Sequence, residues 1–350
     1  MKIKPSHIRL EAATVCQLRC PSCPTTAGAI GRQIGAGFLR YEDFKKIVDE
    51  NPWIADIELS NWGEIFLNPD LLNIMRYAHE HHVRLSAENG VNFNTVRDDM
   101  LEALVRYRVH RITCSIDGAS QETYALYRKQ GRFDDVIEHI KRLNHYKAQY
   151  RSTFPMLRWQ FVVFGHNERE IPIARDMAKR LGMSFWPKLS WDDTFSPVRD
   201  EEFVRRETGL GVASRAEFHA TYGESYLGKQ QCAQLWKQPQ INWDGRVLGC
   251  CVNYLGDFGN AFKEGVLNSV NNEKMRYARQ MLLGTQESRT DIPCSICVHY
   301  RDMKARRAWL RRSDVIERHR GGRFRVSMQR ALDGMYRRIV SLVKRRRVRP

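Results

Sequence analysis

Six short apolar runs alternate with helix-like stretches between residues 8 and 190, and this alternation limits the possible folds more than any other feature. The apolar runs predict strands at 8–13, 55–60, 84–89, 111–116, 158–164 and 184–189. The intervening stretches predict helices near 41–50, 70–81, 95–108, 120–129, 134–149 and 168–181. Strands joined in series by helices lie parallel, so the pattern predicts an α/β fold, either doubly wound or a closed or partial barrel.

The rest of the chain divides into three further parts, after a first domain expected at residues 1–190. Residues 191–230 carry turn-forming and polar residues and are interpreted as a linker. Residues 231–300 begin a different pattern, with the hairpin-like stretch WDGRVLGC followed by loops that contain Gly and Asn. Residues 301–350 form a basic tail. The sequence therefore predicts a large α/β domain, a small cysteine-rich domain and a tail.

The net charge of +17 is concentrated in that tail, where 18 of the 57 Lys and Arg but only 4 of the 40 Asp and Glu lie. Apolar residues recur there at helical spacing, namely Met328, Leu332, Met335, Ile339, Leu342 and Val343. This pattern predicts a basic amphipathic helix that binds an anionic membrane surface. A solvated tail that packs partly on the body is the alternative. Nucleic-acid binding is less favoured, because no known nucleic-acid-binding module accompanies the charge.

The compartment is inferred from the cysteines and the N-terminus. The chain holds nine cysteines, its N-terminus lacks the apolar stretch of a signal peptide, and no run of about 18 apolar residues occurs. In a reducing compartment, thiols suggest metal or redox chemistry rather than disulfides. We therefore expect a cytoplasmic protein, with the tail as a means of attachment to the inner face of the membrane.

Three cysteines lie within the nine residues VCQLRCPSC, at positions 16, 20 and 23, directly after the first predicted strand. Three thiols cannot all pair, and thiols this close in sequence rarely suit disulfide geometry. A structural zinc site usually has four ligands. Cys16, Cys20 and Cys23 would leave one corner of a metal site open, as in an iron–sulfur cube with one iron free for another ligand. Their position after a strand places them at the carboxyl edge of the sheet, where α/β folds build their sites.

The CxxxCxxC motif after the first strand resembles that of the radical S-adenosylmethionine (SAM) superfamily. The resemblance implies a partial (β/α)6 barrel in which Cys16, Cys20 and Cys23 hold a 4Fe–4S cluster and the fourth iron binds SAM. The pattern differs at Ser22, because the family often has an aromatic residue there that packs on the adenine of SAM. That contact must therefore come from elsewhere in the chain.

Three more stretches resemble SAM-binding segments of this family. The stretch NWGEIF (61–66) follows the second strand, where the family has a Gly-Gly-Glu-Pro-like loop. This implies that Gly63 allows close backbone approach and that Glu64 accepts a hydrogen bond from the SAM ammonium group. ENG (88–90) and CSIDG (114–118) end the third and fourth strands. By the same resemblance, contacts to the ribose or methionine are expected from Asn89, Ser115 and Asp117.

A second group of cysteines occurs between residues 232 and 297. On spacing alone, zinc and an iron–sulfur cluster fit this group equally well. The pattern C…INWDGRVLGCCVN…FGN…PCSIC resembles a SPASM-type domain, which implies one auxiliary 4Fe–4S cluster. In that family the cysteine that closes the hairpin is the ligand. The ligands implied are therefore Cys232, Cys250, Cys294 and Cys297, with Cys251 as the alternative to Cys250.

The resemblance also implies the reaction. An electron from a reductant such as flavodoxin or ferredoxin cleaves SAM to methionine and a 5′-deoxyadenosyl radical, and that radical abstracts a hydrogen from the substrate. The auxiliary cluster can then accept an electron, so that the net reaction is an oxidation by a radical SAM oxidoreductase. An oxidised substrate must also lose a proton, so a base is expected. The nearest candidates are Lys188, Asp192 and Asp193.

The substrate class is inferred from the domain organisation and the number of clusters. The barrel begins at once in this sequence, and one auxiliary cluster is enough to oxidise an alcohol. We therefore expect a polar small molecule, with carbohydrate as the leading class. A peptide or protein maturase of the SPASM type is the alternative enzyme. The non-enzymatic alternative is a zinc- or nucleic-acid-binding protein.

Overall fold

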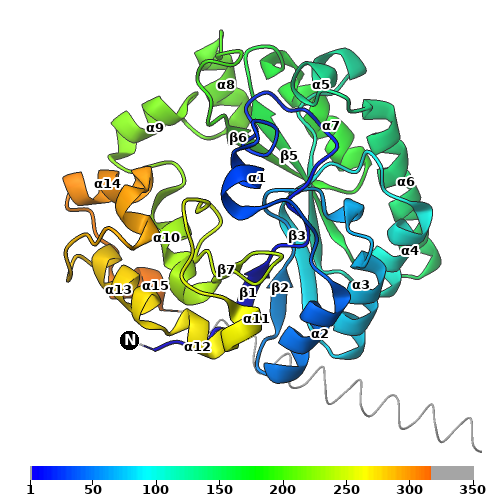
Figure 1. Cartoon of the computed structure of the whole chain (residues 1–350). Helices are drawn as coiled ribbons and strands as arrows, with labels where there is room; N and C mark the ends of the chain where they lie inside the picture. Colours follow the sequence, from blue (N-terminus) through cyan, green and yellow to red (C-terminus); the bar gives the residue numbers. More distant parts are fainter. Residues whose placement is uncertain (1, 317–350) are drawn as a thin grey trace, which may run out of the picture. The chain divides into compact units, whose positions relative to one another are not determined.

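The structure, a computed structural model, describes residues 2–316. These residues form a sheet of seven parallel strands in the order β6-β5-β4-β3-β2-β1-β7 (Figure 1). The strands are β1 (His7–Leu10), β2 (Asp56–Glu58), β3 (Arg84–Val91), β4 (Arg111–Ser115), β5 (Met156–Val163), β6 (Ser184–Leu189) and β7 (Gln240–Ile241). The first six are neighbours in their sequence order. A doubly wound sheet reverses its strand order at a switch point, so this order is that of a partial barrel, and the fold prediction is confirmed.

An outer layer of helices covers the sheet (Figure 1). In α2, Phe44, Ile47 and Val48 are buried at the spacing of one helical face, and this face packs into the core. The helices of this layer agree with the predicted ones to within a few residues. They are α2 (Tyr41–Glu50), α3 (Leu71–Glu80), α4 (Asp98–Arg106), α5 (Gln121–Tyr127), α6 (Phe133–Gln149) and α7 (Ile171–Arg180), with the 3-10 turns η1 (Ile65–Leu67) and η2 (Glu168–Glu170).

The segment expected as a linker, residues 191–230, is partly helical. It contains α8 (Glu201–Thr208), α9 (Arg215–Tyr222) and the start of α10 (Gly228–Lys237). Val204 and Ala213 are buried in the core of the body. The short helices α8 and α9 carry few apolar residues, so their periodicity is weak in the sequence.

The C-terminal part continues with short helices around a hairpin. They are α11 (Ala261–Glu264), α12 (Val266–Val270), α13 (Glu273–Leu282), η3 (Pro293–Ile296), α14 (Val298–Ala305) and α15 (Arg312–Val315). An antiparallel bridge between Ile241 and Val247 forms the expected hairpin. The buried guanidinium of Arg279 donates to the carbonyl oxygens of Leu235 and Val270, in the last turns of α10 and α12. Such carbonyls lack partners within their own helices, so Arg279 holds both helix ends.

The sequence-based boundary at residue 300 differs from the structure. Helix α14 crosses it, and Met303, Leu310 and Val315 are buried against the body, whose compact unit extends to Val315. The apolar residues at 303, 310 and 315 are too widely spaced to give a helical pattern. The amphipathic segment predicted for the tail, with its positions 328–343, lies outside the described residues. Among the helices of residues 2–316, none has the length and apolar character needed to cross a bilayer.

Candidate active site

The first three cysteines lie on the loop that leaves β1. The side chain of Cys20 is buried and those of Cys16 and Cys23 are half-buried. The three pack in one cluster with Leu18 of the same loop and with apolar side chains from the ends of α5 and β5 and the loop after β6, namely Tyr127, Val162, Phe164 and Phe195. The amide of Cys23 donates to the carbonyl of Cys20 over 3.1 Å. The loop therefore presents three thiols at the carboxyl edge of the sheet, as the sequence predicted.

The surroundings of Cys16 and Cys20 favour the neutral form of these two thiols. Burial, reinforced by the charge of Glu64, raises the pKa of the Cys16 thiol to about 12. Burial also raises the pKa of Cys20, against the opposing effect of the Arg128 guanidinium. Thiolates here need added positive charge, which metal ions supply because coordination deprotonates a thiol outright. A set of thiols only, with one open position, fits an iron–sulfur cluster.

A buried ion pair lies against the cysteine loop. Arg128, at the end of α5, donates to the Asp117 carboxylate over 2.7 Å, and the Asp117 side chain has no exposed surface. A second nitrogen of Arg128 donates to the sulfur of Cys20 over 3.7 Å. The amide of Val162 also donates to Asp117. The Asp117 carboxylate is thus used within the protein, and its hydrogen bonds do not support the ribose or methionine contact expected for it.

Gly63 and Glu64 follow β2 and lie directly against the same loop. A Cβ atom on Gly63 would stand 2.4 Å from the carbonyl oxygen of Ala13, so only glycine fits there. The Glu64 carboxylate accepts hydrogen bonds from the amides of Phe66 and Asn92. Burial raises the pKa of Glu64 to about 7 despite these bonds. The close approach expected at Gly63 is present, and Glu64 stands beside Cys16.

The candidates at the ends of β3 and β4 have different surroundings. Asn89 is exposed, and its side chain donates to Asn61 over 2.8 Å. Ser115 is buried, and its hydroxyl accepts from Gln160 over 3.3 Å. A Cβ atom on Gly90 would stand 2.3 Å from that hydroxyl, so the strands approach closely there. Ser115 and Gln160 therefore share one polar position at the carboxyl edge.

The second cysteine group comes together from three elements: α10, the end of the hairpin, and η3 with the residue after it. Burial, followed by the charges of Cys297 and Cys251, raises the pKa of Cys232 to about 12. Burial raises the pKa of Cys250 as well, followed by the charges of Cys251, Cys232 and Cys294. Both candidate ligands at the end of the hairpin, Cys250 and Cys251, therefore lie near the other cysteines of this group. Cys250 is buried, whereas Cys251 is half-buried.

Within residues 2–316, no three His, Cys, Asp or Glu side chains are arranged to hold a single metal ion. In a 4Fe–4S cube each thiolate binds a different iron, so its ligands stand farther apart than the four ligands of one zinc ion.

The three candidate bases lie near the end of β6. The Asp192 carboxylate accepts hydrogen bonds from the hydroxyls of Ser22 and Thr194, which lower its pKa and make it a weak base. Asp193 is exposed, and both aspartates line a cavity of about 220 Å³ at this strand end. Lys188 is half-buried. Burial, reinforced by the charge of Arg215, lowers the pKa of Lys188 to about 8.

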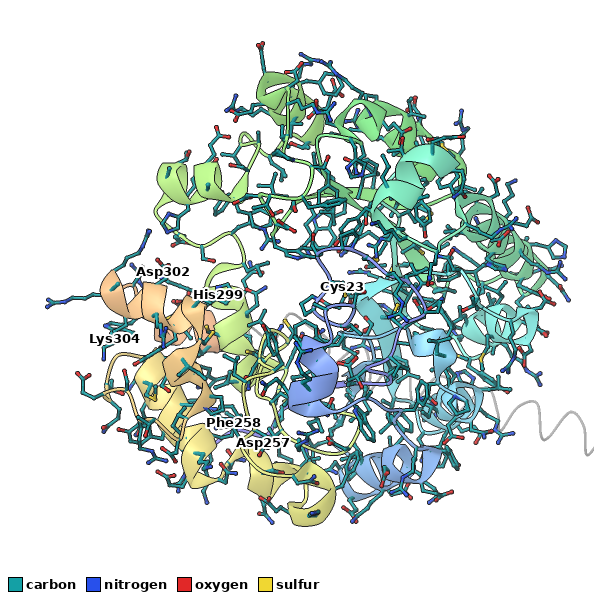
Figure 2. All side chains as sticks on the ribbon, turned by 45° about the horizontal axis from the view of Figure 1, so that its top comes forward. Cys23, Asp257, Phe258, His299, Asp302 and Lys304 are labelled. Atoms are coloured by element: carbon teal, nitrogen blue, oxygen red, sulfur yellow. The ribbon has the colours of Figure 1, made fainter. Side chains whose placement is uncertain are left out.

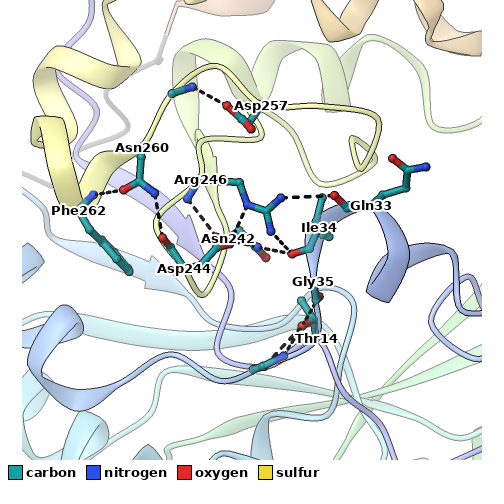
Figure 3. A network of polar contacts seen from close by, with 12 residues as sticks. Thr14, Gln33, Ile34, Gly35, Asn242, Asp244, Arg246, Asp257, Asn260 and Phe262 are labelled. Atoms are coloured by element: carbon teal, nitrogen blue, oxygen red, sulfur yellow. Dashed lines mark hydrogen bonds and ion pairs between the residues drawn. The ribbon is translucent and has the colours of Figure 1, made fainter.

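The hairpin of the C-terminal part is hydrogen-bonded to the segment that follows the cysteine loop (Figure 3). The first cysteines lead into α1 (Ala29–Ile34), and the carbonyl oxygen of Ile34 accepts hydrogen bonds from Asn242 and Arg246. Asp244 pairs with Arg246 over 2.7 Å and orients its guanidinium. Figure 2 shows Cys23 near the centre of the molecule and His299 on α14 at one side. The cysteine loop is therefore held by β1 at one end and by the hairpin at the other.

Sequence reasoning missed several residues of this site. Arg128 reaches Cys20 and Asp117 across the fold, and Arg215 stands beside Lys188. Neither belongs to a spaced motif. The only available signal for Arg128 was its position one helix after Asp117.

Two family models match the chain. Residues 10–170 match the radical SAM superfamily, and residues 232–298 match the SPASM iron–sulfur cluster-binding domain. An AdoMet-dependent heme synthase from Methanosarcina barkeri is 30% identical over 181 residues, which cover 51% of this chain. The match spans about half of that relative's length, 48%.

Solved structures share the fold. SuiB from Streptococcus suis, bound to S-adenosylmethionine, gives a TM-score of 0.59 at 13% identity and covers 85% of this chain and 71% of its own. Native anSMEcpe with bound AdoMet gives a TM-score of 0.57 at 15% identity and covers 84% of this chain and 87% of its own.

The parallel partial barrel, the three-thiol loop at its carboxyl edge and the matching family model define the class: the chain belongs to the radical SAM superfamily. Within that class it carries a C-terminal SPASM domain, as its sequence predicted. These two domains imply a 4Fe–4S cluster, SAM and an auxiliary cluster. The alternative of a zinc- or nucleic-acid-binding protein is therefore set aside.

Proposed function

We propose that this radical SAM enzyme is an oxidoreductase that oxidises a polar small molecule, with carbohydrate as a candidate class. The observation that carries the proposal is the place of Lys188. The charges of Asp117 and Arg128, which lie against the first thiol loop, act on its ammonium group. The charge of Cys251, in the second cysteine group, acts on it as well. The oxidation of a carbon–hydrogen bond requires a proton acceptor, and these charges put Lys188 within electrostatic reach of residues near both thiol groups.

In this proposal Cys16, Cys20 and Cys23 hold the first cluster, and SAM is held by Gly63, Glu64, Asn89 and Ser115. The second cluster is held by Cys232, Cys250, Cys294 and Cys297. When bound, these groups supply a radical that takes a hydrogen atom and an acceptor for one electron. The protein must then take a proton from the substrate. Lys188 serves as that acceptor in preference to Asp192, because the hydrogen bonds to Asp192 favour its charged form.

The small-molecule class has support from the comparison with the heme synthase, since haem is itself a small molecule. A peptide maturase is the second candidate, because one of the solved SuiB structures contains a precursor peptide. At 13% identity that likeness concerns the fold, so the small molecule is preferred. Flavodoxin or ferredoxin is proposed as the reductant, and the basic segment beyond residue 316 as an anchor to anionic lipids in the cytoplasm.

Lys188 is expected to lose its proton at a lower pH than ordinary lysines. Competitive labelling with acetic anhydride, followed by mass spectrometry, should show half-maximal reactivity of Lys188 at a pH of about 8. Free Nα-acetyl-lysine amide in the same mixture is the control, with the usual lysine pKa of about 10.4. Only the neutral amine accepts a proton, so substrate oxidation should rise with pH through this range. A Lys188 that titrates together with this free lysine would remove it as the base.

The oxidation itself depends on the auxiliary cluster, which Cys250→Ala tests. This variant should lose about half of the bound iron, because one of two 4Fe–4S clusters is gone. It should still release 5′-deoxyadenosine from SAM with dithionite, since the first cluster is separate. Cys251→Ala is the matched control and should keep its iron. Iron loss in Cys251→Ala but not in Cys250→Ala would reverse the ligand assignment, and an unchanged iron content in both would contradict the auxiliary site.

A further inference from the structure

Two basic side chains without acidic partners lie at the mouth of the barrel beyond β6. Arg215 begins α9, and Lys188 lies near the end of β6. Among residues 2–316, neither forms an ion pair with a carboxylate, although the charge of Asp193 acts on Arg215. Both are half-buried, and the charge of Arg215 acts on Lys188. Two like charges therefore act on each other, and among the described residues no carboxylate forms an ion pair with either of them.

Other buried arginines of this protein show how such a charge is normally accommodated. Arg128 pairs with Asp117, and Arg279 donates to two backbone carbonyls at helix ends. Arg215 makes one hydrogen bond, from Nε to the carbonyl of Leu189 over 3.2 Å. Its two terminal nitrogens have no hydrogen-bond partner among the described residues. They are not among the buried polar atoms that lack a partner, so they keep contact with water and are accessible to a ligand. The partial burial of the guanidinium lowers the pKa of Arg215.

Aromatic rings surround these cations. The guanidinium carbon of Arg215 lies 4.8 Å from the ring centre of Tyr226 and 6.0 Å from that of Trp191. The Lys188 nitrogen lies 5.4 Å from the ring centre of Trp186. Trp186 and Trp191 are exposed enough to contact a ligand. The two terminal nitrogens of Arg215 are thus available as hydrogen-bond donors, next to the flat apolar faces of aromatic rings.

We propose that the substrate carries a carboxylate or a similar acidic group, which the guanidinium of Arg215 binds beside Lys188. Arg215 is a binding residue in this scheme, because its planar fork matches two carboxylate oxygens. The rings of Trp191 and Tyr226 hold the adjoining body of the molecule. The acid group then fixes the distance between the reacting carbon and Lys188. This inference rests on the proposed function, since it names the substrate class of the same site.

The test uses full-length reconstituted protein with a pair of probes of equal shape, 2-naphthoate and the neutral 2-naphthamide. Calorimetry should show that naphthoate binds at least about tenfold more tightly, as expected for a charge-assisted pair of hydrogen bonds. Arg215→Gln should remove that preference. Arg180→Gln, which removes an exposed charge at the end of α7, should keep it. Arg215→Lys should give an intermediate preference for naphthoate over naphthamide. It replaces Arg215→Gln as the test if the glutamine variant does not fold.

Three results would overturn the proposal: equal binding of both probes by the unmodified protein, an unchanged preference in Arg215→Gln, or an equal loss in Arg180→Gln. The same preparation is assayed for 5′-deoxyadenosine formation from SAM with dithionite. Protein that cleaves SAM but binds both probes equally would contradict only the acidic substrate. Protein that prefers naphthoate but does not cleave SAM would contradict only the proposed function.

Discussion

Replacing Cys16, Cys20 or Cys23 with alanine is expected to abolish the release of 5′-deoxyadenosine from SAM and about half of the bound iron. Each of these cysteines supplies one of only three thiols on the loop, and the described surroundings offer no fourth thiol to replace it. Anaerobic reconstitution, iron and sulfide analysis and product detection by chromatography measure both effects. The loss of activity should be complete rather than partial, because a cluster with two protein ligands is not held.

Cys114→Ala is the matched control for these variants. Cys114 is a thiol of the same protein with no exposed surface, and it packs in the main core cluster rather than in the cluster of the three loop cysteines. Its replacement should cost on the order of 1 kcal/mol of unfolding free energy and leave iron and SAM cleavage unchanged. Full activity in any of the three loop variants would refute the ligand assignment.

Arg128→Met is expected to destabilise the fold by about 3–5 kcal/mol, because it leaves the Asp117 carboxylate buried without its partner. The Asp117 side chain has no exposed surface, so water cannot replace the lost charge. Urea denaturation followed by circular dichroism measures the change.

The double variant Arg128→Met with Asp117→Asn controls for the lost packing of the arginine. Since the buried charge is removed from both sides, the double variant should be more stable than Arg128→Met alone. Equal stability of the single and double variants would show that the ion pair contributes nothing specific. Arg132→Met removes an exposed charge near α6 and should change stability by less than about 0.5 kcal/mol.

The strands β4 and β5 were predictable because most of their residues are buried, so that they appear in the sequence as apolar runs. β7 was not predictable, because two residues cannot show a period and its partner β1 is far away in sequence. The helices α8 and α9 were missed for a related reason, since much of their surface faces water. The spacing of apolar residues in a sequence reflects which side chains are buried, so a helix that buries few side chains shows little periodicity.

The clustering of Cys16, Cys20 and Cys23 was predictable from their spacing, since one loop brings these thiols together without help from the rest of the fold. The residues around them depend on long-range packing. Arg215 meets Lys188 only once α9 has folded against the end of β6, and nothing in the local sequence marks the pair. The expected role of Asp117 shows the same limit. Its place after β4 was right, but its ion pair with Arg128 depends on how α5 returns to the sheet.

The pairing of β1 with β7 has a consequence for the order in which the chain can fold. The side chains of Arg9 and Gln240 are hydrogen-bonded over 2.9 Å although 231 residues separate them. During synthesis the N-terminal strand therefore remains an open edge until almost the whole body has left the ribosome. An unpaired edge strand can join a neighbouring chain. Nascent chains that stop before residue 240 should thus associate with one another. In the complete body, β7 of the SPASM hairpin covers the edge of β1.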